Sequence, residues 1–157
     1  HRLYQPDRDG AKSSLTLSIF SGEDHRAFEA IGLRVVLDRS GECLCLEGGV
    51  NICFRIAKWR RYAGRPARWT IMRRSRSQQG WVVAMRLGED NQRIRDYLLV
   101  PSSSIVSNGR LFWVSENPRK AMKIERFDTF QELSRSLLYR VRKTLRSRAQ
   151  RSRLSER

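Results

Sequence analysis

Apolar and polar positions follow a two-residue period along much of the chain, which is typical of strands with one buried face. Clusters of Gly, Ser, Asn and Pro separate these stretches and predict turns between them. The pattern therefore indicates a mostly antiparallel sheet of five to seven strands. The expected strands cover residues 14–20, 42–47, 50–56, 67–74, 80–87, 94–100 and 110–114.

An acidic segment near the N-terminus follows a helical period instead. Ser21 is a capping residue, and Glu23 and Asp24 follow it in the first turn, where acids are favourable. The pattern predicts a helix from about 22 to 38, ended by Ser40-Gly41. We expect this helix to face away from any polyanion. The residues on its apolar face are Phe28, Ile31 and Val35.

The C-terminal helix has the clearest signal in the chain. Thr129 and Glu132 form a capping box, and apolar residues recur every three or four positions as far as Leu145. The helix should run from about 129 to at least 146. Beyond it no apolar face is left to bury, so 147–157 is either a frayed tail or a helical extension that becomes ordered on binding.

Together these elements predict the α+β class, with one N-terminal acidic helix and one basic, amphipathic C-terminal helix. The chain of 157 residues is long enough to bury a core. We expect a polar arm over 1–13, a single domain over 14–146 and a basic flexible tail over 147–157.

Two hairpins are expected within the sheet. In the first, 42–47 and 50–56 flank a Gly48-Gly49 turn, and each opposed pair of residue numbers sums to 97. This register places Cys43, Cys45, Ile52 and Phe54 on the core face and Cys53 on the other face. The second hairpin joins 67–74 to 80–87.

The three cysteines, Cys43, Cys45 and Cys53, cannot all pair with one another, and they sit among apolar residues. No C-x-x-C knuckle is present, so a zinc site is not expected. Free thiols indicate a reducing compartment, either cytoplasmic or nucleoid-associated. No stretch of about 20 apolar residues predicts a membrane span, and no signal peptide is recognised.

The charge is extreme and unevenly distributed. The formal net charge is +16 and the isoelectric point is about 11.2. Residues 1–50 carry a net −2, whereas residues 51–157 carry a net +18. Self-repulsion of this size favours a polyanionic partner. Of the 32 basic residues 27 are Arg, whose planar guanidinium grips phosphate with two hydrogen bonds.

The predicted binding residues lie in two stretches, one within the strand region and one in the C-terminal helix. Lys58-Trp59-Arg60-Arg61-Tyr62 places aromatic rings beside cations, as single-strand binding requires. Alternatively, Trp59 and Tyr62 pack into the core while the cations face water. The predicted residues are Lys58, Trp59, Arg60, Arg61, Arg65, Arg68, Arg73, Arg74, Arg76, Arg86, Arg140, Arg142, Lys143, Arg146 and Arg148.

Three interpretations of the C-terminal helix are open. The helix could pack on the sheet, enter a duplex major groove, or lie on an anionic membrane surface. Its apolar stripe consists of Leu and Val after a folded sheet, which favours core packing over membrane contact.

Catalytic chemistry has little support in the sequence. The two histidines, His1 and His25, form no constellation, and no phosphate-binding glycine loop occurs. No cofactor, metal ligand or catalytic residue is therefore assigned. The order of a helix followed by antiparallel strands is similar to the restriction-endonuclease core, but no acid in the strands is followed two residues later by Lys. Acids that a metal-dependent nuclease could use are Glu42, Glu47, Glu89, Asp90 and Asp96.

The sequence thus predicts a nucleic-acid-binding module with an Arg-rich surface, DNA being favoured over RNA as the partner. The chain starts at His1 rather than Met, which we interpret as an accessory domain of a larger DNA-processing or mobile-element protein, such as a recombinase. Other parts of the same polypeptide or complex are then further partners. The alternatives are the metal-dependent nuclease and an RNA-binding component of a ribonucleoprotein.

Overall fold

The computed structural model describes residues 22–30, 33–38, 41–46, 50–72, 80–105, 111–118, 120 and 123–156. The expected arm over 1–13 and the expected strand over 14–20 lie outside these ranges. The helices are α2 (Gly22–Ala30), the short 3-10 helix η1 (Ser102–Ser104) and α3 (Phe130–Ser155). The strands are β1 (Leu33–Asp38), β2 (Gly41–Leu46), β3 (Val50–Arg60), β4 (Arg68–Met72), β5 (Gly80–Leu87), β6 (Ile94–Pro101), β7 (Leu111–Ser115) and β8 (Glu125–Phe127).

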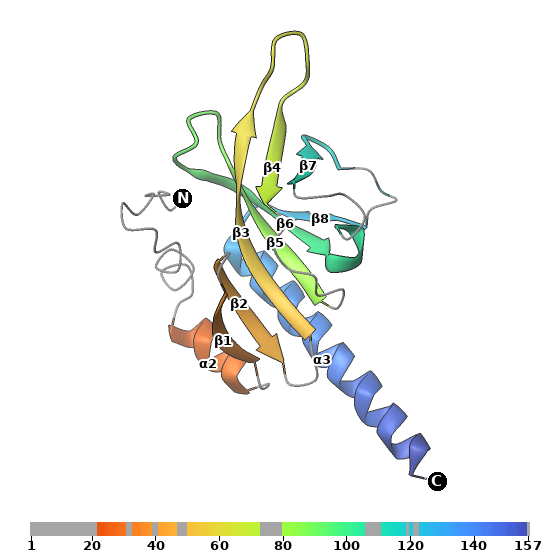
Figure 1. Cartoon of the computed structure of the whole chain (residues 1–157). Coiled ribbons are helices and arrows are strands. Elements are labelled where there is room, and N and C mark those ends of the chain that lie inside the picture. The colour runs from red at the N-terminus through yellow and green to blue at the C-terminus, as the bar shows by residue number, and fades with distance from the viewer. Residues whose placement is uncertain are drawn as a thin grey trace.

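The strands form one curled sheet (Figure 1). Six of them follow the order β1-β2-β3-β5-β6-β8, and β4 and β7 branch off this path, where β4 pairs with both β3 and β7. Every described pairing is antiparallel except that of β3 with β5. The predicted α+β class with a mostly antiparallel sheet is confirmed, and the six strands of the main path fall within the expected number.

Two hydrophobic clusters cover the two faces of the central strands. On one face, Val83, Met85 and Leu87 of β5 pack against Leu133 and Leu137 of α3. On the other face, side chains from β4 and β7 close over the sheet. Strands β5 and β6 are therefore buried on both sides, which explains their long apolar runs. The second cluster contains Ala57, Trp69, Ile71, Ala84, Leu98, Val100, Ile105 and Val114.

Helix α3 begins where the sequence predicts. The Thr129 hydroxyl accepts a hydrogen bond from the Glu132 backbone N–H at 3.3 Å, as in a capping box. The buried side chains of the helix end at Val141, with Leu145 partly buried against the same cluster. The helix nevertheless continues to Ser155, so residues 147–155, expected as a flexible tail, are helical here.

The predicted helix over 22–38 is too long. Helix α2 ends at Ala30, and residues 33–38 form β1, which pairs with β2 from Leu33↔Leu46 to Asp38↔Gly41. Gly32 weakens a helix at this point, and the adjacent Val35 and Val36 favour an extended backbone. Residues 33–38 are therefore a strand, because pairing with β2 outweighs a helical spacing of apolar residues that is only approximate.

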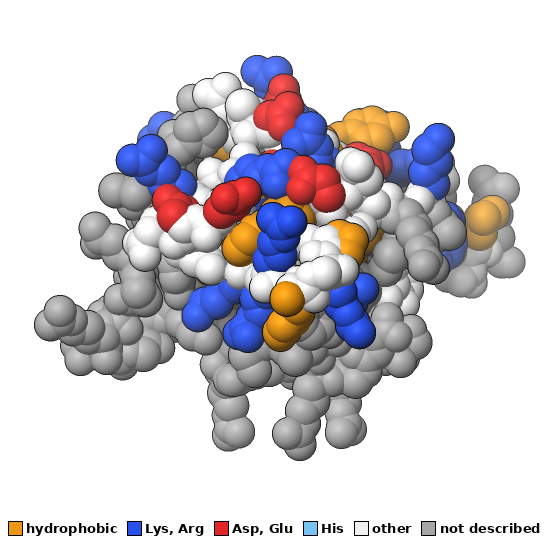
Figure 2. All heavy atoms as spheres, turned by 90° about the horizontal axis from the view of Figure 1, so that it is seen from above, with side chains coloured by type: hydrophobic (Ala, Val, Ile, Leu, Met, Phe, Trp, Pro, Cys, Tyr) orange, Lys and Arg blue, Asp and Glu red, His pale blue; other side chains and the backbone are white. Residues whose placement is uncertain are grey.

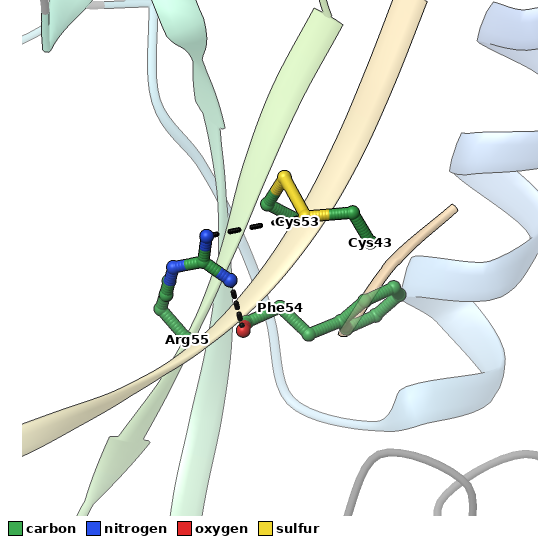
Figure 3. Close-up of a disulfide and its surroundings, with 4 residues drawn as sticks. All are labelled: Cys43, Cys53, Phe54 and Arg55. Carbon is green, nitrogen blue, oxygen red and sulfur yellow. Dashed lines mark hydrogen bonds between the residues drawn. A yellow bond between two sulfur atoms is a disulfide. The ribbon is translucent and has the colours of Figure 1, made fainter. Parts of the chain in front are cut away.

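The first hairpin is confirmed, but its register differs by one residue. Cys43 lies opposite Cys53 and Leu46 opposite Val50, so opposed residue numbers sum to 96. Three residues rather than two connect the strands. Because a one-residue shift moves side chains to the other face, Cys43 and Cys53 share a face and form a disulfide (Figure 3). The prediction of free thiols is wrong for this pair, and the cysteines give no reason to assign a reducing compartment.

The second predicted hairpin does not form. Strand β4 folds back on β3, with Trp59 opposite Trp69, through a turn in which the Arg65 N–H donates to the Tyr62 carbonyl at 3.0 Å. Strand β5 instead runs parallel to β3, starting at Gly80 beside Asn51. Gly80 has φ +111°, and a Cβ there would overlap the Asn51 carbonyl. Only glycine permits this close approach.

None of the described helices is both long enough and apolar enough to cross a membrane.

Candidate nucleic-acid interface

The hairpin formed by β3 and β4 carries a group of five cations, which we call the hairpin group. It consists of Lys58, Arg60, Arg61, Arg65 and Arg68, and all five are exposed. Strand alternation separates this group from the core, because Ala57 and Trp59 point inward while Lys58 and Arg60 point to solvent. No Asp or Glu occurs between residues 57 and 68. In the described part of the chain, none of the five cations forms a salt bridge.

The pairing of β3 with β4 brings like charges together. Arg60 lies directly opposite Arg68 in the register, and both side chains are exposed. Like charges at directly opposed positions destabilise a strand pair. The free protein thus holds cations where their repulsion lowers stability, which a bound polyanion would relieve.

A rigid base supports the hairpin group. The Trp69 ring is fully buried, and its indole N–H donates to the Leu87 carbonyl at 2.7 Å. The Asn91 side chain bridges the backbone of Trp59, accepting from its N–H at 2.7 Å and donating to its carbonyl at 3.1 Å. These bonds tie the edge of β3 to the β5–β6 turn. The backbone beneath Lys58 and Arg60 is therefore fixed.

The two aromatic residues of the Lys58–Tyr62 stretch differ in their surroundings. Trp59 is partly buried and packs against the cluster that contains Trp69. Tyr62 is 53% exposed beside the turn. The core interpretation therefore fits Trp59, whereas Tyr62 is the aromatic residue that a base could reach.

Arg86 does not belong to the surface. Its side chain is fully buried, and it forms a two-bonded ion pair with the equally buried Asp96, Nε to Oδ1 at 2.7 Å and Nη2 to Oδ2 at 2.6 Å. Its Nη1 donates to the carbonyls of Ser115 and Glu116, at 2.9 and 3.0 Å. The guanidinium also lies 4.6 Å from the centre of the Trp69 ring. The prediction of Arg86 as a nucleic-acid-binding residue is therefore wrong. Its side chain connects β5, β6 and the end of β7.

Three further arginines are neutralised by acids. Arg95 pairs with Glu116 and Arg140 pairs with Glu125. Arg126 lies 3.2 Å from Asp96 and 3.0 Å from Asp128. The hydrogen bond from Arg95 holds the pKa of Glu116 below its usual value, so this carboxyl stays charged and the pair stays intact near neutral pH. Arg140, a predicted binding residue, is therefore less available than its neighbours on α3.

The other predicted cations on α3 form a second surface. Arg142, Lys143 and Arg146 are exposed, and Arg148 is partly buried. Three exposed arginines that the sequence interpretation left out accompany them, Arg135, Arg151 and Arg153. Placing the residues at 3.6 per turn would have found Arg135 and Arg153 on the same face as Arg142 and Arg146.

These two surfaces lie at opposite ends of the molecule. The β3–β4 hairpin projects from one end, and the C-terminal part of α3 projects from the other (Figure 1). Seen onto the hairpin end, Lys and Arg side chains are spread over the surface with several Asp and Glu among them (Figure 2). The two predicted stretches thus form separate surfaces. Arg73, Arg74 and Arg76, expected to continue the first stretch, lie outside the described residues.

The acids proposed for the nuclease alternative form no metal-binding group among the described residues. In the ranges that the structure covers, no three His, Cys, Asp or Glu side chains form a group that could hold a metal ion. Asp96, a candidate acid for the nuclease alternative, accepts hydrogen bonds from Arg86 and Arg126 on its two oxygens. Asp90 accepts from the backbone N–H groups of Gln92 and Arg93 in the β5–β6 turn, which lowers its pKa. Both acids have structural roles.

Comparison with known protein families, curated proteins and solved structures gives no match.

Proposed function

We propose that the protein binds nucleic acid through phosphate contacts, with DNA favoured over RNA and little choice of sequence. The observation that carries the proposal is the hairpin group, in which five exposed cations lack acid partners in the described structure. Phosphate neutralisation by Lys and Arg supplies most of sequence-independent binding.

The contrast with the paired arginines supports this choice. Where the fold needs an arginine, as at Arg86 and Arg95, it provides a carboxylate within hydrogen-bonding reach. Arg60 and Arg68 oppose each other instead. An arrangement that costs stability in the free protein is explained if the cations act on a ligand. The role as an accessory module of a larger DNA-processing protein stays a prediction.

The test compares two matched pairs of substitutions in the whole chain. Arg60→Gln with Arg68→Gln removes two cations that form no salt bridge within the described residues, and Arg95→Gln with Arg140→Gln removes two that are paired with Glu116 and Glu125. Both variants lose the same formal charge. Affinity for a fluorescent 25-base-pair duplex, measured by anisotropy from 50 to 200 mM salt, should fall in the first variant. Its log–log salt slope should become less steep by about 1.8, or 0.9 for each lost phosphate contact.

The second variant should keep a salt slope near that of the unaltered protein. Equal losses in the two variants would show that only net charge matters, and the hairpin group would not be the site. Absence of binding by the unaltered protein to duplex and single-stranded DNA and RNA would overturn the proposed function itself.

A further inference from the structure

The C-terminal part of α3 is largely exposed. Buried side chains on the helix end at Val141, and from Arg146 to Ser155 every side chain is exposed except Arg148, which is partly buried. The helix has 26 residues, and its last part extends past the strands (Figure 1). At a rise of 1.5 Å per residue, the ten residues from 146 to 155 add about 15 Å of projecting helix.

The cations of this projecting part lie in two rows. At about 100° per residue, Arg146 and Arg153 differ by only about 20° around the axis, and Arg148 and Arg151 by about 60°. The first row is about 140–160° from the second, so the rows lie on opposite flanks of the helix. Arg146, Arg151 and Arg153 form no salt bridge in the described structure.

Between the rows the side chains are uncharged. Ser147, Gln150 and Leu154 occupy one strip, and Ala149 and Ser152 occupy the other. The part from 146 to 155 therefore has no continuous apolar face, unlike the part that packs on the sheet. A helix that is polar all round gains little from packing against an apolar partner or the interior of a lipid surface.

A groove with phosphates on both walls fits this arrangement. The major groove of B-form DNA is about 12 Å wide, and a helix with its side chains is about 10–12 Å across. A helix inserted along the groove meets one phosphate backbone on each flank and base edges between them. The A-form groove of duplex RNA is too narrow for side chains to be read in the same way.

We propose that residues 146–155 of α3 enter the major groove of duplex DNA, with Arg146 and Arg153 contacting one backbone and Arg148 and Arg151 the other. This inference rests on the proposed function, because it names the form of nucleic acid and the second surface that contacts it. One uncharged strip then faces the bases. On the first strip Ser147 and Gln150 can form hydrogen bonds with base edges, and on the second strip Ser152 can form hydrogen bonds and Ala149 can contact a thymine methyl.

The experiment removes one row at a time from the whole chain. Arg146→Gln with Arg153→Gln removes the first row, and Arg148→Gln with Arg151→Gln removes the second. Glutamine keeps a good helix propensity, and circular dichroism checks that helix content is unchanged. Binding is measured against a 25-base-pair DNA duplex, an RNA duplex of the same sequence and vesicles of one-quarter phosphatidylserine. Methylation of guanine N7, an atom in the major groove, reports the position of the helix.

Each row variant should make the salt slope on duplex DNA less steep by about 1.8, since each loses two phosphate contacts. The unaltered protein should protect guanine N7, and both row variants should lose this protection. The RNA duplex should bind more weakly and be insensitive to the rows. These three results together support the inference.

Loss of affinity in only one of the two row variants would place the helix on the outside of the duplex and overturn the inference. Absent N7 protection, equal dependence of RNA binding on the rows, or capture by vesicles in preference to DNA would also overturn it. The proposed function is tested independently of the helix. If only the helix assignment were wrong, the variant with Arg60→Gln and Arg68→Gln would still bind DNA more weakly.

Discussion

Arg60 and Arg68 lie directly opposite each other on β3 and β4, and both point to solvent. Side chains at such positions have Cβ atoms about 4.5–5.5 Å apart, and like charges there oppose pairing of the strands. If this surface binds DNA, the charge of Arg68 lowers the stability of the free protein and raises its affinity for DNA. On a merely hydrated surface the charge would affect stability alone.

Arg68→Glu should stabilise the free protein while weakening DNA binding. The new carboxylate faces Arg60 and converts repulsion into an opposite-charge pair worth about 0.2–1 kcal/mol. Urea unfolding should show a higher free energy of unfolding, and anisotropy should show lower affinity. Arg65→Glu is the matched control, since Arg65 has the same charge but lies in the turn between the paired strands. A less stable Arg68→Glu variant, or one with undiminished affinity, would contradict this interpretation.

Arg86→Met should destabilise the protein without removing a contact to DNA. The substitution leaves Asp96 buried and two carbonyl groups without their donor. Breaking one side of a buried ion pair costs about 3–5 kcal/mol. Urea unfolding measures this loss, and affinity per folded molecule should not change. Adding Asp96→Leu should restore part of the stability, because no buried carboxylate is then left without the two hydrogen bonds from Arg86. A stable Arg86→Met variant with weak binding would mean that Arg86 acts on the ligand.

The protein can be unfolded and alkylated without a reducing agent and then analysed by mass spectrometry. Cys43 and Cys53 should be linked, and only the thiol of Cys45 should be alkylated. The two cysteines are ten residues apart, and closing such a loop stabilises a fold by about 2–3 kcal/mol in the chain-entropy model. Cys43→Ser with Cys53→Ser should therefore lower the midpoint of thermal unfolding. Three alkylated cysteines in protein kept under oxidising conditions would be evidence against the pairing.

Trp59→Ala and Tyr62→Ala should have different effects. Trp59 packs on the cluster around Trp69, so its removal should lower the melting temperature. The free energy of unfolding should fall by less than the about 3–5 kcal/mol that truncation of a fully buried Trp costs. Tyr62 is exposed, so its removal should leave stability within about 0.5 kcal/mol. Single-strand affinity should fall only for Tyr62→Ala if this ring stacks on a base. Thermal melts with binding to a labelled 20-mer measure both quantities. A Trp59→Ala variant with full stability and weak binding would contradict the core assignment.

Capping residues and apolar spacing in the sequence predicted the element that depends mainly on local interactions, helix α3. The cap at Thr129 and the apolar stripe behind it placed α3 correctly at its start. The same reasoning left the extension to Ser155 open, as a frayed tail or as a helix ordered on binding, because it relied on an apolar face and gave too little weight to a segment without Gly or Pro. The error over 31–38 has the opposite cause, since β1 depends on pairing with β2.

Non-local pairings decided what the sequence left open. One extra residue in the β2–β3 connection changed the register and brought Cys43 to Cys53. The parallel pairing of β3 with β5 and the branching of β4 have no short-range signal. Whether an arginine is exposed or paired depends on these contacts. Arg86 is a partial exception, because the turn between β5 and β6 was recognised and places Asp96 nearby on the next strand.

The salt dependence of DNA binding by the unaltered chain shows directly whether the hairpin group contacts phosphates. If the hairpin group contacts five phosphates, the log–log slope of affinity against salt should be at least as steep as about −4.5. Affinity for a 25-base-pair duplex should then fall at least about 500-fold between 50 and 200 mM salt. A slope flatter than about −1, with at most one phosphate contact, would contradict the account.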